Sequence, residues 1–143
     1  MSLEFREFKI TDHPEALRLW ESTEGIGLSD ADSLANVSAF LARNPGLCFV
    51  ATEGANLVGT ILCGHDGRRG LIHHLAVTSE HRRKGVGRRL VAAALNALRS
   101  TGIQKCHLLV FERNEAARAF WRKIDAEERE TLVVFSLMTT NAR

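Results

Sequence analysis

The segment Arg82–Arg89 combines positive charge with glycine at close spacing. Five of its eight residues are arginine or lysine, and Gly85 and Gly87 lie among them. Glycine lets the main chain approach a ligand that a Cβ would keep away. The free N–H groups and the dipole at a helix start favour anions, and guanidinium groups donate forked hydrogen bonds to phosphate oxygens. The segment is therefore a candidate phosphate-binding loop.

Other phosphate-binding motifs do not match these residues. A Walker loop requires G-K-[ST] after four intervening residues, and that string is missing. A dinucleotide fingerprint would place glycine or alanine where Leu90 stands, and its first glycine would directly follow the strand that ends near Val77. A solvated basic helix start with incidental glycines stays open as an alternative explanation of this segment alone.

A second motif, later in the chain, makes the interpretation of this loop more specific. Arg82–Gly87 matches R-x-x-G-x-G, the coenzyme A signature of the GNAT superfamily of N-acetyltransferases, and Asn114–Trp121 is similar to that family's later N-x-x-A-x-x-F-Y segment. The expected order of strands and helices, from Leu3 to Met138, also resembles the family. The chain is therefore identified as a member of the GNAT superfamily, with residues 1–143 as one GNAT-like domain.

The resemblance implies an enzyme that moves an acetyl group from acetyl-coenzyme A directly to a primary amine of a small molecule or peptide. It also implies which residues bind the cofactor. Amides of the glycine loop would hold the pyrophosphate, the preceding strand would pair with the pantetheine arm, and an asparagine would contact that arm. The residues concerned are Leu75, Ala76, Val77, Arg82, Arg83, Lys84, Gly85, Val86, Gly87, Arg88 and Asn114. Asn114 also suits the N-cap of the helix that follows it.

Two departures from the family concern the chemical step. The family often uses a tyrosine to protonate the departing thiolate, but this position is Trp121, and the chain contains no tyrosine. An indole N–H donates hydrogen bonds and is not an ordinary proton donor. The family's following glycine and aromatic pair is replaced by Asp125 and Ala126. These departures favour one alternative, a non-catalytic acyl-coenzyme A sensor.

His73 and His74 precede the loop on the same expected strand. An amine with a pKa of about 10.4 is only about one part in 2,500 unprotonated at pH 7, so a base near the acceptor is useful. Side chains alternate along a strand, which predicts that Leu71, His73, Leu75 and Val77 share one face and that His74 lies on the other. We expect His73 to be the base and His74 to pack against a helix.

Patterning predicts an α/β (α+β) fold, a mixed central sheet flanked by about four helices. The expected strands are Leu3–Ile10, with Phe8 and Ile10 inward, and Leu47–Glu53, Leu57–Gly64, Leu71–Val77, Lys105–Phe111 and Thr131–Met138. The expected helices follow Thr11 or Asp12, run over about Asp32–Ala42 and Gly85–Ser100, and cover Glu115–Lys123. Gly102 is expected to end the long helix in a left-handed cap.

Composition limits the partners. The net charge of +2 is small, and no aromatic residues alternate with the basic segment, so a nucleic-acid-binding module is disfavoured. No apolar run reaches membrane-spanning length, and a cytoplasmic location is expected.

Cys48, Cys63 and Cys106 lack metal-ligand spacing, as do the histidines, so reduced thiols and no metal are expected. A homodimer is possible, since dimers are frequent in the resembled family.

The acceptor itself is not identified by a motif. Its pocket is expected around Trp20–Ala42 and the last strands, where motif content is lowest. Glu24, Asp30 and Asp32 are candidates for attracting a cationic amine, although acidic loop residues are usually only solvated.

Overall fold

The structure is a computed structural model and describes residues 2–141. The chain forms two compact units that divide after Phe111. The first unit contains the whole sheet, and the second contains one helix and the C-terminal segment.

The sheet has five strands in the order β1-β2-β3-β4-β5. The strands are β1 Leu3–Glu7, β2 Phe49–Glu53, β3 Asn56–His65, β4 Gly70–Val77 and β5 Cys106–Leu108. The first four pair antiparallel, and β5 pairs parallel with β4. The expected mixed sheet flanked by helices is thus confirmed.

Residues 2–141 contain four α-helices: α1 His13–Ser22, α2 Leu34–Arg43, α3 Val86–Ser100 and α4 Glu115–Lys123. Short 3-10 turns occupy Ile10–Asp12, Asp30–Asp32, Ser79–His81 and Thr139–Asn141. Within residues 2–141, none of the helices has the length and apolar character needed to cross a membrane.

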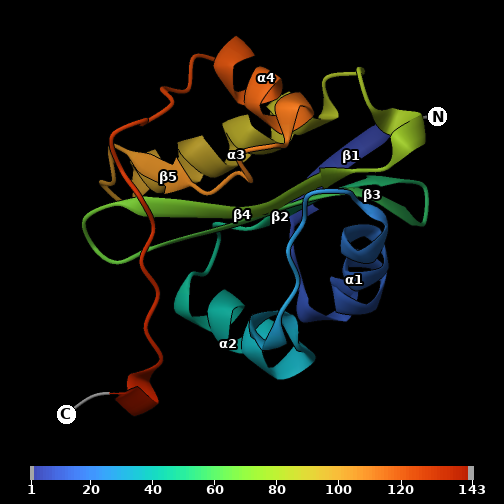
Figure 1. Ribbon diagram of the computed structural model, residues 1–143. Helices are drawn as coiled ribbons and strands as arrows, with labels where there is room; N and C mark the ends of the chain where they lie inside the picture. The colour runs from blue at the N-terminus through green and yellow to red at the C-terminus, as the bar shows by residue number, and fades with distance from the viewer. Residues whose placement is uncertain (1, 142–143) are drawn as a thin grey trace. The chain divides into compact units, whose positions relative to one another are not determined.

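Helices cover both faces of the sheet in the first unit: α1 and α2 lie on one face and α3 on the other (Figure 1). The core beneath α1 joins Phe8 and Trp20 to Val50 and Ala76, all nearly inaccessible to solvent. On the opposite face α3 packs so closely that a Cβ added at Gly59 would lie only 3.0 Å from the side chain of Leu90. Helices therefore pack against both faces of β4 and fix its position. Most of the predicted site residues lie on this strand or directly after it.

Two cysteines belong to this core. The Sγ of Cys48 lies 3.3 Å from both the carbonyl oxygen and the amide nitrogen of Cys63. Burial raises the pKa of Cys48 to about 11 and that of Cys63 to about 12. All three cysteines are free thiols in the structure, Cys48 and Cys63 buried and Cys106 half-buried.

Most predicted helices are confirmed. The helix α4 has the predicted bounds, and α3 begins one residue after Gly85. Gly102 adopts a left-handed φ of 91°, as expected of the residue that ends α3. The helix α2 begins at Leu34, because Ser33 caps it by accepting from the amide of Asn36.

The predicted strands differ from the structure at their ends, by one or two residues in β2, β3 and β4 and by more in the other three. The strand β1 ends at Glu7, where the chain turns into the 3-10 turn at Ile10, although Phe8 is buried as expected. The strand β5 covers only Cys106–Leu108. The predicted strand Thr131–Met138 is not a strand: no described residue pairs with it, and Phe135 is 89% exposed. Its β-branched and aromatic residues favour a strand, but a strand requires a partner.

Candidate active site

A β-bulge in β4 determines where the two histidines lie. Thr60 pairs with Ala76 and Leu62 with His73, so one residue of β3 faces two residues of β4. His74 takes up the extra residue with a left-handed φ of 49°. The alternation expected along β4 therefore breaks at His74.

The bulge places both histidines on the sheet face that α1 and α2 cover. The His73 ring lies edge-on to Phe40 of α2, and the His74 ring lies 4.7 Å from the Trp20 ring of α1. The prediction that His74 faces away from His73 was wrong. Beyond the bulge Ala76 joins the core beneath α1, so Leu75 and Val77 point to the other face, not to the face of His73 as predicted.

His74 is the centre of a buried polar network. Its Nε2 lies 2.6 Å from Oδ1 of Asp32, and its carbonyl oxygen accepts from the hydroxyl of Thr60. The Thr60 hydroxyl oxygen in turn accepts from the Trp20 indole N–H at 2.9 Å. The main-chain oxygen of Asp32 is 2.8 Å from Nε2 of His13. Hydrogen bonds thus fix the bulge to α1 and to the 3-10 turn Asp30–Asp32.

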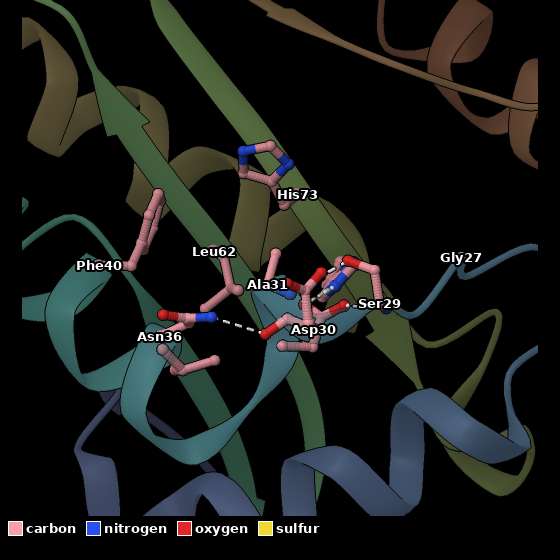
Figure 2. Close-up of a pocket in the computed structure, with 11 residues that line it drawn as sticks. Gly27, Ser29, Asp30, Ala31, Asn36, Phe40, Leu62 and His73 are labelled. Atoms are coloured by element: carbon pink, nitrogen blue, oxygen red, sulfur yellow. Dashed lines mark hydrogen bonds and ion pairs between the residues drawn. The ribbon is translucent and has the colours of Figure 1, made fainter. Parts of the chain in front are cut away.

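A cavity of about 480 Å³ opens beside this network. Figure 2 shows Asn36 and Phe40 of α2, Leu62 of β3 and His73 of β4 around it. Its remaining lining comes from Gly27, Ser29, Asp30, Ala31, Asp32, Val37 and His74. The cavity is thus apolar at Val37, Phe40 and Leu62 and acidic at the 3-10 turn, which suits a ligand with a cationic amine.

His73 differs from His74 in its surroundings. The imidazole ring of His73 has no hydrogen-bond partner within residues 2–141, and it lines the cavity next to Phe40. Burial, followed by the electrostatic effect of the neighbouring His74, lowers the pKa of His73 below the ordinary histidine value. The ring is therefore neutral at pH 7, with a nitrogen lone pair able to accept a proton.

The glycine loop has the backbone geometry expected of an anion site. Gly85 caps α3 in the left-handed conformation, with a φ of 80°, and Arg83 is also left-handed at 62°. In the described part of the chain, the amides of Arg83, Lys84 and Gly85 donate to no protein oxygen. Arg82 holds the loop to the end of β4 through its Nε–H, which donates to the carbonyl of Val77.

His81 supports the base of this loop. Its Nδ1 is 2.7 Å from the Thr78 hydroxyl, and its Nε2 is 3.2 Å from a carboxylate oxygen of Glu53 on β2. It is half-buried, in agreement with a structural role.

The edge of β4 that faces β5 is open over most of its length. The two strands pair only from Gly70 to Ile72, opposite Cys106–Leu108. From His73 to Val77 the backbone on this edge has no strand partner among the described residues. Leu75, Ala76 and Val77, the predicted pantetheine-binding residues, all lie in this open stretch.

The remaining predicted residues belong to the second unit. Asn114 caps α4, because its Oδ1 accepts from the amide of Ala117 at 3.1 Å. Trp121 lies on the same helix, edge-on to Phe120. At the end of α4 Asp125 adopts a left-handed φ of 69°, at the position where the resembled family has glycine.

Sequence reasoning missed the bulge and the partner of His74. Asp32 is predicted from the sequence as a candidate for attracting a cationic amine, and its buried contact with His74 is not. The available signal was the pair His73-His74 within an otherwise apolar strand. Among residues 2–141, no group of His, Cys, Asp or Glu side chains has the arrangement of a metal site.

Comparison with known proteins agrees with this geometry. The family model described as "Acetyltransferase (GNAT) family" matches residues 12–125. An acetyltransferase of Photorhabdus laumondii is 33% identical over 135 residues, covering 94% of each chain. An acetyltransferase of Sodalis glossinidius is 27% identical over 132 residues, covering 92% of each.

Solved structures share the fold. The PaiA N-acetyltransferase of Thermoplasma acidophilum, solved in complex with coenzyme A, gives a TM-score of 0.74 at 21% identity, over 87% of this chain and 89% of that chain. Ard1 of Thermoplasma volcanium gives 0.74 at 24% identity, over 87% and 82%. The chain therefore belongs to the GNAT family and is an acyl-coenzyme A-dependent N-acyltransferase.

Proposed function

We propose that the protein transfers an acetyl group from acetyl-coenzyme A directly to a primary amine of a small molecule or peptide. The main support for the proposal is that β4 connects the acidic cavity to the glycine loop. Its open edge begins at His73 beside the acidic cavity and leads through Val77 to the glycine loop. A cofactor bound along this edge would have its phosphates at the loop and its acyl end at the cavity.

The loop fits a pyrophosphate. The free amides of Arg83, Lys84 and Gly85, with those of Val86, Gly87 and Arg88 at the start of α3, would donate to phosphate oxygens. The Arg82 and Arg88 side chains add positive charge. The open backbone of Leu75, Ala76 and Val77 would pair with the amide groups of the pantetheine arm as a neighbouring strand does. We assign Asn114 the second role of contacting that arm, in addition to its capping role.

The coenzyme supplies an acetyl group activated as a thioester. The protein's part is to bring an unprotonated amine to it. We assign the acceptor amine to the cavity at Asp30, Asp32 and His73, where the acidic turn favours a cationic amine over other solutes. His73 then accepts the proton from the amine at a ring nitrogen. Its low pKa keeps the ring neutral, and so ready to accept, over the neutral pH range.

The family match spans the boundary between the two units, from residue 12 to residue 125. This supports treating residues 1–143 as one functional GNAT-like domain. It also favours an enzyme over a non-catalytic sensor, although Trp121 replaces the usual tyrosine.

The test is a panel of acceptors with acetyl-coenzyme A: polyamines, aminoglycosides, amino acids and peptides with free N-termini. Free thiol release and the mass of the product are measured together. We expect amine-dependent thiol release with an acceptor heavier by one acetyl group. Coenzyme A binding without transfer to any amine would contradict the proposal and favour the sensor.

A further inference from the structure

A second cavity, of about 370 Å³, adjoins the acidic one. Phe40 and His73 line both cavities, so the two form one continuous surface along α2 and β4. The second cavity extends toward the start of β4, where Leu71 and Gly70 line it. It lies away from the glycine loop, which follows the other end of the strand.

The charge of the second cavity is opposite to that of the first. Arg43 and Arg69 line it, together with His65 and His107. Its one carboxylate, Asp66, already accepts from the amides of Arg68 and Arg69 at 2.8 and 2.9 Å. Neither lining arginine lies within ion-pair distance of a carboxylate in the described part of the chain. Arg69 donates one hydrogen bond, from Nη1 to the carbonyl oxygen of Arg68 at 3.2 Å. The other donors of the two guanidinium groups are thus available to an anion.

The first cavity has the reverse composition, since no lysine or arginine lines it and two carboxylates do: Asp30, and Asp32, whose oxygens already contact His74 and Ser29. Between the two ends the shared wall is formed by the rings of Phe40 and His73, with Leu62 on one side and Leu71 on the other. From His73 to Gly70 the strand rises roughly 10 Å. The surface therefore has an acidic end, an apolar middle and a basic end.

We infer that the acceptor carries a carboxylate several carbon atoms from the amine that is acetylated. The inference rests on the proposed function and adds the substrate class. The amine would lie at His73 and the acidic turn, an aliphatic spacer would lie along Phe40 and Leu71, and the carboxylate would lie at Arg43 and Arg69. Guanidinium groups suit this role because their paired donors match the two oxygens of a carboxylate.

The test compares acceptors that differ only at the far end. Terminal amines of aminobutyrate, aminohexanoate and aminooctanoate are compared with alkylamines of the same chain length, using acetyl-coenzyme A as donor. We expect kcat/KM to be roughly tenfold higher for an aminoalkanoate than for its matched alkylamine, since each exposed ion pair contributes only a modest share of the affinity.

The double variant Arg43→Glu, Arg69→Glu should reduce this preference to about one or reverse it. The matched control is Arg99→Glu, an exposed arginine in the last turn of α3 that lines neither cavity. It should keep the wild-type preference, and circular dichroism checks that all variants fold.

Equal kcat/KM for aminoalkanoates and alkylamines in the wild type would overturn the inference while leaving amine acetylation intact. A preference that survives the double variant would overturn it as well. Absence of transfer to every amine would instead reject the proposed function, and the substrate class with it.

Discussion

The Nε2 of His74 lies 2.6 Å from Oδ1 of Asp32, although 42 positions separate the two residues in the chain. Their side chains are only 14% and 11% exposed, so the pair is shielded from water. The contact joins the bulge of β4 to the 3-10 turn that forms the acidic end of the cavity. The shape of the cavity therefore depends on this pair.

We predict that the two residues are energetically coupled. Asp32→Ala removes the partner of a buried ring, and His74→Ala removes the partner of a buried carboxylate, so each should lower the free energy of unfolding by a few kcal/mol. The double variant should cost about 1 to 3 kcal/mol less than the sum of the single variants. Urea denaturation of all four proteins measures the difference.

This double-mutant cycle also cancels the loss of a second hydrogen bond made by Asp32. The other oxygen of Asp32 accepts from the amide of Ser29, and this bond is missing in every Asp32→Ala protein. Asp32→Ala combined with His107→Ala, on β5, serves as the control and should be additive within about 0.5 kcal/mol. Additivity of the His74 pair to the same precision would show that the contact contributes nothing to stability.

A second prediction concerns His73 as the base. His73→Gln keeps a side chain of similar size that cannot accept the proton, so kcat/KM for the amine should fall about a hundredfold or more. The wild-type activity should decline only at pH values below the ordinary pKa of histidine, because burial lowers the pKa of His73. Steady-state rates from pH 5 to 9 measure both effects.

The variant should lose the acidic decline that His73 causes and should bind coenzyme A as tightly as the wild type. His74→Ala, in contrast, should act mainly through stability. Equal kcat/KM of His73→Gln and wild type at every pH would mean that water or another group takes the proton.

His73 should also make stability depend on pH. Its pKa is lower in the folded protein than in the unfolded chain, where it is about 6.5. The unfolded state therefore binds more protons below this value, and the free energy of unfolding should decrease as the pH falls through about 6.5. In His73→Gln the decrease over this range should be smaller. Melting temperatures from pH 5 to 8 test this, and an identical slope in both proteins would contradict it.

Elements with a local cause could be predicted from the sequence. The helix α3 follows a glycine and repeats its apolar residues at helical spacing, and α4 follows the capping residue Asn114. Both motifs of the family fall at these helix starts, which is why the sequence alone allows this loop to be proposed as the phosphate site.

Features that depend on pairing could not be predicted. The bulge exists because β3 supplies one residue where β4 supplies two, and the sequence of β4 does not contain its register with β3. Strict alternation therefore gave the wrong face for His74. The segment Thr131–Met138 has the composition of a strand, but composition cannot supply the neighbouring strand that it needs.

A fourth prediction tests the glycine loop. Gly87→Val puts a branched side chain at the start of α3, next to the amides assigned to the pyrophosphate, so coenzyme A should bind at least tenfold more weakly because those amides are screened. The control, Ala92→Val, is a change to the same residue at an exposed position of the same helix. Calorimetry of both variants measures the affinity. Unchanged affinity in a folded Gly87→Val protein would reject the cofactor assignment.

The last prediction concerns Trp121, which stands where the resembled family often has the tyrosine that protonates the thiolate. An indole N–H has no proton to give in the accessible pH range, so Trp121→Phe should lower kcat by less than about tenfold, whereas loss of a true acid costs about a hundredfold or more. Trp121→Tyr introduces a phenol with a pKa of about 10. If that phenol donates the proton, kcat should rise and should then decline as the pH approaches 10, a decline absent from the wild type. Thiol release from pH 6 to 10.5 distinguishes the three proteins, because only the tyrosine variant has an ionisable group at this position. A hundredfold loss in Trp121→Phe, with coenzyme A binding intact, would mean that the indole itself acts in the reaction.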